Sequence, residues 1–224
     1  KMLKPILYKE WIKTRWYFLL AILVSIGFTG YSLLRVNRVI GLKGMEHLWQ
    51  VMLERDVIFI DLQMYIPLII GILLAIVQFV PEIQQSRLKL TLHLPYPHYR
   101  IIAVMLLYGI LVLLVCFVFN FIFMSVYFIG ILAGELVKHI LMTALTWYIA
   151  GFTGYLLTAW ICLEPTWKRR ILNIVIAVCV LRVFFLSAVP EAYNSFLPVL
   201  IGYTSLTVLL SMLSVYRFKT GQQD

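Results

Sequence analysis

The stretch that decides the fold is Ile101–Gly134, IIAVMLLYGILVLLVCFVFNFIFMSVYFIGILAG, which runs for 34 residues without a charged side chain. A helix of that length measures about 51 Å, whereas the hydrocarbon core of a bilayer is about 30 Å thick. We therefore assign a membrane span to Ile101–Ser125. The remainder, Val126–Gly134, is expected to form either a helical extension beyond the membrane or a short re-entrant piece.

The composition of the whole chain has the same character. Hydrophobic residues make up 62% of the 224 residues and charged residues 13%, against about 25% charged in soluble domains. A soluble fold of this size leaves much of its surface in water and would expose many of these side chains. A lipid bilayer covers them instead, and the 15% aromatic content fits because Trp and Tyr favour the headgroup region. We expect one membrane domain, residues 1–224.

Apolar runs long enough to cross a bilayer recur along the chain. Together with Ile101–Ser125 they predict an all-α membrane protein with six transmembrane helices. The other predicted spans are Trp16–Leu34, Met64–Val80, Ile140–Cys162, Ile171–Val189 and Leu197–Tyr216. The first of these, Trp16–Leu34, is too long for the apolar core of a signal peptide and lacks a small-residue cleavage site, so we interpret it as a retained helix.

Basic residues fall mainly on one side of this arrangement. With the N-terminus in the cytoplasm, thirteen Lys and Arg residues lie in cytoplasmic segments and five in outer segments. Because positive charge is retained inside, we expect both termini in the cytoplasm and the protein in the bacterial inner membrane. The net charge of +9 then serves orientation, and no nucleic acid partner is expected. The five outer residues are Arg35, Arg38, Lys43, Arg55 and Lys138.

The first residues, Met2–Arg15, follow another pattern. Leu3, Ile6, Leu7 and Trp11 recur on one helical face, with basic residues elsewhere. This spacing favours an amphipathic helix that lies in the membrane interface. The alternative is a basic, frayed N-terminus that only contributes to the charge asymmetry.

The sequence holds no motif of a catalytic, metal or cofactor site. It contains no G-x-x-x-x-G-K-[ST] loop for ATP, no H-E-x-x-H zinc motif and no G-x-S-x-G nucleophile motif. His93 and His98 lie in one segment, but such a pair is more often solvated than metal-bound. The cysteines Cys116, Cys162 and Cys179 lie within apolar runs and match no zinc or redox spacing. We expect this chain to bind no cofactor and no metal.

Arg182 is the one ionisable residue inside a predicted span, which makes it a functional candidate. It is expected to pair with Glu191, Glu135 or Asp61, or to extend to the outer headgroups. Because a proton or ion relay needs several ionisable groups within the membrane, we favour a structural role for this arginine.

Two kinds of residue within the spans predict helix packing. The neutral polar residues Asn120 and Gln78 are expected to form hydrogen bonds between helices. Small residues allow helix backbones to approach closely. They are Gly71 and Ala75 in the second span, and Ala150, Gly151 and Gly154 in the fourth.

The segment that joins the second and third spans is the most informative. It reads PEIQQSRLKLTLHLPYPHYR from Pro81 to Arg100 and lies on the predicted cytoplasmic side. Pro81 suits the first turn of a helix, and Glu82 suits its positive end. The leucines from Leu88 to Leu94 alternate with other residues, so a short strand-like piece is an alternative to the helix. A short basic and apolar element between two spans is a docking surface for a soluble partner, although an ordinary cytoplasmic loop is the simpler interpretation.

Two stretches resemble ABC-2 type transporter permeases. The opening Lys4–Trp11, KPILYKEW, looks like the family's amphipathic connecting helix, which commonly carries such a Lys-Glu pair. The second stretch consists of Glu82, Arg87, Leu90, Leu94-Pro95 and Tyr99-Arg100 entering an apolar span.

The second stretch departs from the family pattern in two places. The Gly-Thr that often follows the family's glutamate is absent after Glu82, and no Lys opens the third span, where Val104 and Met105 stand.

The resemblance implies the membrane subunit of an ABC transporter, most often an exporter in this family. Its partners would be ABC ATPase subunits, which bind ATP and Mg, and a second copy of the chain or a similar permease. The segment 81–100 would be a cytoplasmic coupling helix. Its ATPase contacts would be Glu82, Arg87, Leu90, Leu94 and Pro95.

Three other functions stay open. A mechanical subunit of ABC type would pass motion to an extracytoplasmic partner through the outer segment Arg35–Gln63. A membrane-embedded lipid enzyme would need a polar cluster facing the bilayer, for which the sequence offers Arg182 and scattered neutral residues. A secondary transporter is disfavoured because charge is scarce within the predicted spans.

Overall fold

The computed structural model describes residues 3–55, 58–84, 98–187 and 189–219, and helices make up nearly all of this part of the chain. In chain order the elements are α1 (Leu3–Arg55), η1 (Asp61–Gln63), α2 (Ile66–Gln84), α4 (His98–Ile129), α5 (Gly134–Leu163), α6 (Trp167–Arg182), η2 (Val183–Phe185), η3 (Asn194–Phe196) and α7 (Leu197–Lys219), where η marks a short 3₁₀ helix. The described residues contain no strand, so the predicted all-helical class is confirmed.

Five helical segments are long and apolar enough to cross a membrane. The predicted fifth span, Ile171–Val189, corresponds to α6 and η2, and α6 alone has 16 residues, fewer than the roughly 20 that a bilayer needs. The multi-pass membrane character is therefore confirmed, and the sixth span stays a prediction. The five segments are Lys4–Glu54, Asp61–Ile83, Tyr99–Ile129, Gly134–Leu163 and Asn194–Arg217.

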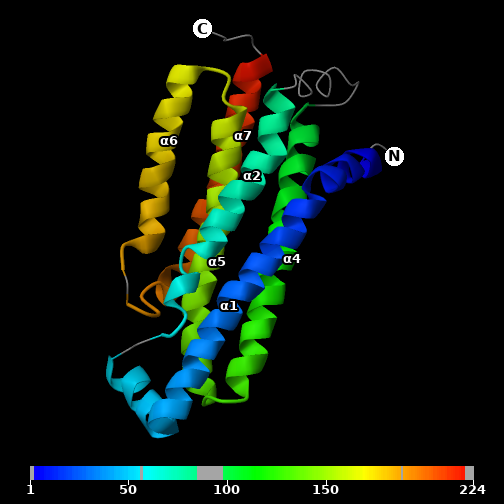
Figure 1. Ribbon diagram of the computed structural model, residues 1–224. Coiled ribbons are helices and arrows are strands. Elements are labelled where there is room, and N and C mark those ends of the chain that lie inside the picture. Colours follow the sequence, from blue (N-terminus) through cyan, green and yellow to red (C-terminus); the bar gives the residue numbers. More distant parts are fainter. Residues whose placement is uncertain (1–2, 56–57, 85–97, 188, 220–224) are drawn as a thin grey trace.

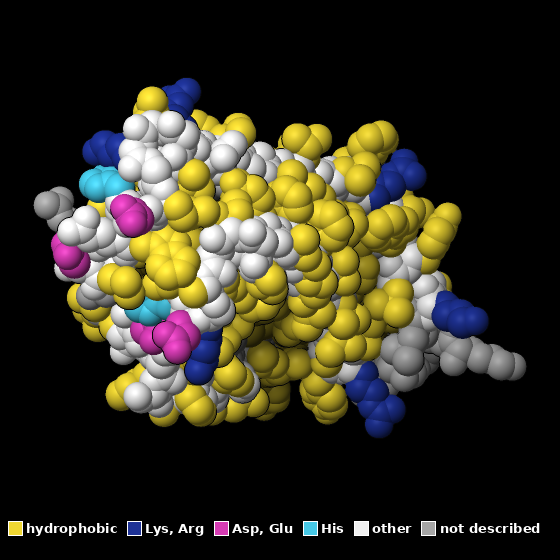
Figure 2. Space-filling model, turned by 90° about the horizontal axis from the view of Figure 1, so that it is seen from below, with side chains coloured by type: hydrophobic (Ala, Val, Ile, Leu, Met, Phe, Trp, Pro, Cys, Tyr) yellow, Lys and Arg dark blue, Asp and Glu magenta, His cyan; other side chains and the backbone are white. Residues whose placement is uncertain are grey.

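The long helices run side by side, and both chain termini lie at one end of the bundle (Figure 1). We call this the terminal end. The end of α2, the start of α4 and the connection from α5 to α6 lie there as well, whereas α1 turns toward α2 at the opposite end (Figure 1). Seen from that opposite end, hydrophobic side chains form a broad continuous area, and acidic and histidine side chains gather toward one side (Figure 2).

The closest helix contact joins α2 and α5 at glycines. A Cβ atom on Gly71 would lie 2.1 Å from the carbonyl oxygen of Gly151, and one on Gly151 would lie 2.7 Å from the carbonyl oxygen of Pro67. A Cβ atom on Gly154 would lie 2.5 Å from the side-chain Cδ1 of Leu68. The two helix backbones therefore touch directly, as the small residues in the second and fourth spans predict.

α5 is the central helix of the bundle. In its most apolar stretch 78% of residues are buried within the protein, against 17% in α7. Its neighbours are α2, α4, α6 and α7. The exposed apolar side chains of the outer helices, such as Leu23 and Val178, are those that lipid would cover.

α1 is longer than the predicted first span, Trp16–Leu34, and includes much of the outer segment Arg35–Gln63. The helix continues beyond Leu34 and ends at Arg55, with one break at Gly44, whose backbone is left-handed with φ 81°. Glycine suits this break because it adopts positive φ without steric cost. The segment beyond the break folds because Leu48 and Met52 are buried, at 0% and 4% exposure, so packing offsets the polar character of the sequence.

The N-terminal residues 3–15 are helical, as the amphipathic pattern predicts, and the frayed alternative is not found. These first turns are continuous with the predicted first span, and Figure 1 shows them inclined away from the rest of α1. Tyr8, Trp11 and Ile12 are exposed there. Their placement in a membrane interface stays a prediction.

Pro81 corrects a second expectation, that the second span ends there and a new helix opens. α2 runs through Pro81 to Gln84. A proline inside a helix removes one hydrogen bond and crowds the carbonyl four residues earlier. α2 nevertheless continues for three residues beyond Pro81, and in the same turn Lys13 Nζ donates to the carbonyl of Gln78 at 2.9 Å. For Val126–Gly134 the sequence left open a helical extension or a re-entrant piece. α4 extends to Ile129, which favours the helical extension.

Gly71→Ala should destabilise the bundle, because the added methyl group would overlap the carbonyl oxygen of Gly151. Overpacking of this kind costs about 1–3 kcal/mol, which thermal unfolding in detergent would detect as a lower Tm. Gly30→Ala is the matched control, since nothing lies within 4 Å of its added Cβ. Equal melting temperatures for the two variants would contradict the close α2–α5 contact.

Candidate functional site

Two carboxylates and two lysines meet where the first turns of α1 pack on the last turn of α2. We call Lys9, Glu10, Lys13, Gln78 and Glu82 the Glu82 junction. Residues four apart in a helix lie on one face, so Lys9 and Lys13 project together from α1, as Gln78 and Glu82 do from α2. The sequence therefore presents two matched faces, and the fold places them against each other (Figure 1).

Glu82 is the centre of this junction. Its carboxylate accepts hydrogen bonds from Lys9 Nζ at 3.0 Å and from Lys13 Nζ at 2.9 Å. Lys13 Nζ also donates to Glu10 Oε1 at 3.0 Å. Both carboxylates are 0% exposed, whereas the lysine side chains are 37% exposed for Lys9 and 13% for Lys13. The pairs are therefore charge-assisted and largely shielded from water.

Burying two carboxylates is costly, and the lysines compensate for it. The effective penalty is several kcal/mol per ion unless each charge is paired and hydrogen-bonded. Glu82 satisfies this requirement with two lysines. Glu10 does so only in part, because its Oε2 has no hydrogen-bond partner among the described residues. The junction holds α1 on α2 as long as both partners are present, since removing one leaves a buried charge.

Neutral hydrogen bonds extend the junction to α4 and α5. Gln78 Nε2 donates to the carbonyl of Met105 at 2.8 Å, and the Tyr155 hydroxyl donates to Gln78 Oε1 at 2.8 Å. Tyr155 is fully buried and fits because position 109 is glycine, where a Cβ would lie 2.0 Å from its hydroxyl oxygen. Four helices are thus tied together at one level, as expected for Gln78.

Asn120 organises a second polar cluster, nearer the opposite end. Its Oδ1 accepts from Thr29 at 3.0 Å, from Gln63 at 2.9 Å and from the Tyr148 hydroxyl at 3.3 Å. Its Nδ2 donates to the hydroxyl of Ser25. The cluster joins α1, η1, α4 and α5, so Asn120 forms the interhelical hydrogen bonds expected from its position in an apolar run.

The predicted site residues have different outcomes. Glu82 lies in the junction, where it is buried and bound to lysines of the same chain. Its contact with an ATPase stays a prediction. The other predicted ATPase contacts lie outside the described residues. They are Arg87, Leu90, Leu94 and Pro95.

Arg182 is exposed and ends α6. Among the described residues no carboxylate lies within ion-pair distance of it, and Glu191 instead binds His139 Nδ1 at 3.3 Å. The alternative in which Arg182 extends to the headgroups fits this placement, and its structural role stays a prediction.

The sequence did not indicate that Glu10 and Glu164 are buried, nor that Glu82 pairs with Lys13. Glu10 was quoted as half of a Lys-Glu pair, but the contact between Lys13 and Glu82 was not anticipated. Glu164, at the end of α5, is 0% exposed, accepts a hydrogen bond from Ser214 and lies 3.8 Å from Arg217 Nη1. The sequence signal for Glu164 was its position at the end of a long apolar run, close to the basic triplet Lys168-Arg169-Arg170.

Within the described residues no group of three or more His, Cys, Asp or Glu side chains is placed to hold a metal ion. The two polar clusters consist of ion pairs and hydrogen bonds that join helices. Comparisons with protein-family models, curated proteins and solved structures find no match to this chain.

Glu82→Ala should destabilise the protein strongly, because it leaves Lys13 largely buried beside Glu10 alone. Breaking a buried pair costs about 3–5 kcal/mol, measured as a loss of thermal stability in detergent. Glu54→Ala is the control, since Glu54 is exposed and accepts one hydrogen bond from Gln50 at 3.1 Å. If the two variants melt together, the junction does not hold α1 on α2.

Proposed function

We propose that the chain is the membrane-spanning subunit of an ABC-2 type ATP-binding cassette transporter, in the direction of export. The observation that supports it best is the contact between Lys9 and Glu82, which are 73 residues apart and bond at 3.0 Å. Each belongs to one of the two stretches that resemble this family. A family pattern made of two distant pieces gains support when the pieces meet in space.

The Glu82 junction gives this function a mechanical basis. The segment 85–97 follows the last turn of α2, so a force applied there by a soluble partner passes directly into that helix. Lys9 and Lys13 hold the same turn to α1, and Gln78 holds it to α4 and α5. The first turns of α1 and the end of α2 therefore move as one unit, which a partner can bias between two states.

In this proposal the chemistry occurs on the partners. ABC ATPase subunits bind and hydrolyse ATP with Mg, and this chain binds no cofactor. The membrane subunit pairs with a second copy or with a similar permease in the bacterial inner membrane. The residues that contact the ATPase are those of the segment 81–100, with Leu90 and Leu94 as the apolar anchors.

We also propose that α6 and η2 together form a sixth span. The 16 residues of α6 measure about 24 Å, and the three residues of η2 add about 6 Å, which together equals the roughly 30 Å of a bilayer core. Exposed apolar side chains on α6, such as Ile171 and Val175, support contact with lipid. The terminal end is then cytoplasmic, in agreement with the thirteen-to-five charge asymmetry.

Cysteine labelling tests this topology. In a background without native cysteines, Glu54→Cys and Lys168→Cys should react with a membrane-impermeant reagent from opposite sides. Glu54 is in the last turn of α1 and Lys168 in the first turn of α6, and these helix ends lie at opposite ends of the bundle (Figure 1). Only Glu54→Cys should be labelled in intact cells. Labelling of both positions from outside would overturn the six-span arrangement.

A double substitution tests the coupling segment. Leu90→Ser with Leu94→Ser should release the ATPase, because losing one buried anchor typically costs about 2 kcal/mol or more. Arg87→Glu should weaken the complex less if this residue lies at a solvated rim. The measurements are pull-down from detergent and ATP turnover of the purified complex.

The control for this test is Leu42→Ser with Leu53→Ser, two exposed leucines of α1 that are not part of the segment 81–100. This control should keep the ATPase bound. An ATPase that stays bound and coupled after the change at Leu90 and Leu94 would place the contact elsewhere. A fully active protein without any ATPase partner would refute the family assignment.

One observation favours a mechanical variant of this function, in which motion reaches an extracytoplasmic partner. The segment beyond Gly44 is a folded helix, and Leu48 and Ile60 anchor it, both at 0% exposure. A structured element at the end opposite the termini provides a contact for such a partner. A tightly bound extracytoplasmic protein, together with ATPase activity that no solute stimulates, would favour this variant over export.

A further inference from the structure

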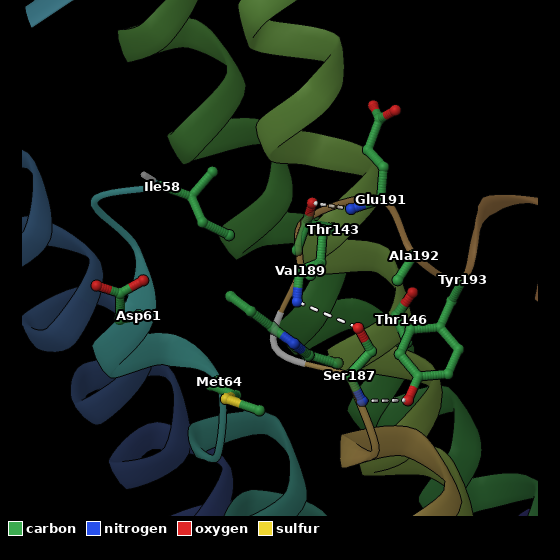
Figure 3. Close-up of a pocket in the computed structure, with 11 residues that line it drawn as sticks. Ile58, Asp61, Met64, Thr143, Thr146, Ser187, Val189, Glu191, Ala192 and Tyr193 are labelled. Atoms are coloured by element: carbon green, nitrogen blue, oxygen red, sulfur yellow. Dashed lines mark hydrogen bonds between the residues drawn. The ribbon is translucent and has the colours of Figure 1, made fainter. Parts of the chain in front are cut away.

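A cavity of about 250 Å³ lies in the half of the bundle away from the termini. Three segments line it: the chain around η1, the first half of α5, and the connection between η2 and α7 (Figure 3). The residues lie far apart in the sequence, so no motif marks the cavity. It is smaller than the roughly 300–1,000 Å³ of drug-sized ligand sites, which restricts any ligand to a small molecule.

The cavity wall formed by the η2–α7 connection is held in place by internal hydrogen bonds. The Tyr193 hydroxyl accepts from the backbone N–H groups of Leu186 and Ser187 at 3.0 and 3.1 Å, and it donates to the carbonyl of Val183 at 2.9 Å. The N–H of Glu191 donates to the Thr143 hydroxyl of α5 at 3.2 Å (Figure 3). The site is therefore formed before a ligand binds, which lowers the entropy cost of binding.

Two buried polar side chains of α5 line this cavity without a partner. Thr146 is 3% exposed and Trp147 is 7% exposed. Neither the Thr146 hydroxyl nor the Trp147 indole N–H is hydrogen-bonded to another residue in the described part of the chain. Because an indole only donates, a ligand group that bonds to the Trp147 N–H is an acceptor.

The charge at the cavity is negative. Asp61 and Glu191 both line it, and the lining includes no Lys or Arg among the described residues. The Glu191 carboxylate is already bound to His139, which leaves Asp61 as the carboxylate available to a ligand. Arg35 acts on Asp61 electrostatically but forms no ion pair with it in the described part of the chain.

We propose that this cavity binds a small organic ammonium compound that also carries a hydroxyl group. The positive charge lies near Asp61, and the hydroxyl oxygen accepts from the Trp147 indole and pairs with Thr146. The aromatic rings of Trp147 and Tyr193 add cation–π attraction for alkylammonium groups. This proposal goes beyond the transporter function and does not depend on it, because binding is a property of the chain without any ATPase.

Choline is the probe, and 3,3-dimethyl-1-butanol is its neutral isostere with the same shape and hydroxyl group. Equilibrium dialysis of labelled choline against the purified full chain in detergent should show saturable binding. The neutral isostere should compete at least about tenfold more weakly, because it lacks the charge that faces Asp61.

Three variants locate the site. Asp61→Asn should weaken choline binding at least about tenfold, and Trp147→Phe should weaken it about three- to tenfold because it removes the indole donor but keeps an aromatic ring. Glu54→Gln is the matched control, an exposed carboxylate of the neighbouring segment outside the cavity, and it should bind as the unaltered chain does. Absence of saturable binding, or unchanged binding by a folded Asp61→Asn variant, would overturn the proposal.

A second test of the site uses a variant that changes no charged residue. In a cysteine-free background, Ala192→Cys should react faster with a trimethylammonium methanethiosulfonate than with a neutral one, relative to Leu53→Cys outside the cavity. Choline should protect Ala192→Cys. No preference for the cationic reagent and no protection would refute the site even if Asp61→Asn fails to fold.

Discussion

A polar group inside a lipid bilayer has no water to bind, so each one must find its partner within the protein. The spans are helices because that conformation satisfies the peptide groups internally. The hydroxyl groups of the spans obey the same constraint: Thr14, Thr143 and Thr153 each donate to the carbonyl four residues earlier, at 2.9, 2.9 and 3.0 Å. The polar residues that remain collect into clusters between helices, and these clusters define the places where function is proposed.

α2 connects these clusters. Its middle lies against α5, where Gly71 meets Gly151. One end carries Gln78 and Glu82, which bind α1, α4 and α5. Just before the other end, Gln63 in η1 donates to Thr29 and Asn120. In the proposed function, α2 is the helix along which a displacement at the terminal end would reach the far end of the bundle.

The proposed ammonium site lies at that far end. Asp61 and Met64 flank Gln63 and line the cavity, while Gln63 belongs to the Asn120 cluster. The proposed coupling segment and the cavity are thus attached to opposite ends of one helix. In such an arrangement, occupancy at one end and docking at the other bias the same element, which is the physical requirement for coupling between two sites.

The sequence predicted the features that depend on local composition. The apolar runs located the long helices, the small residues marked the α2–α5 contact, and Asn120 and Gln78 were recognised as interhelical hydrogen-bonding residues. It failed where packing overrides local pattern. The segment after Arg35 is polar enough to be interpreted as a loop, yet it is helical because Leu48 and Met52 are buried. Pro81 suggests a helix boundary by its local pattern, yet α2 continues through it to Gln84.

Hydrophobicity is a property of each residue and its neighbours, so the sequence by itself determined that this chain forms membrane helices and roughly where they lie. Ion pairs and cavities depend on residues that are far apart in the chain. Lys9 and Glu82 are 73 positions apart, and the cavity takes Asp61, Trp147 and Glu191 from three separate segments. Only the tertiary structure decided these contacts, because the register and rotation of packed helices place the side chains in space.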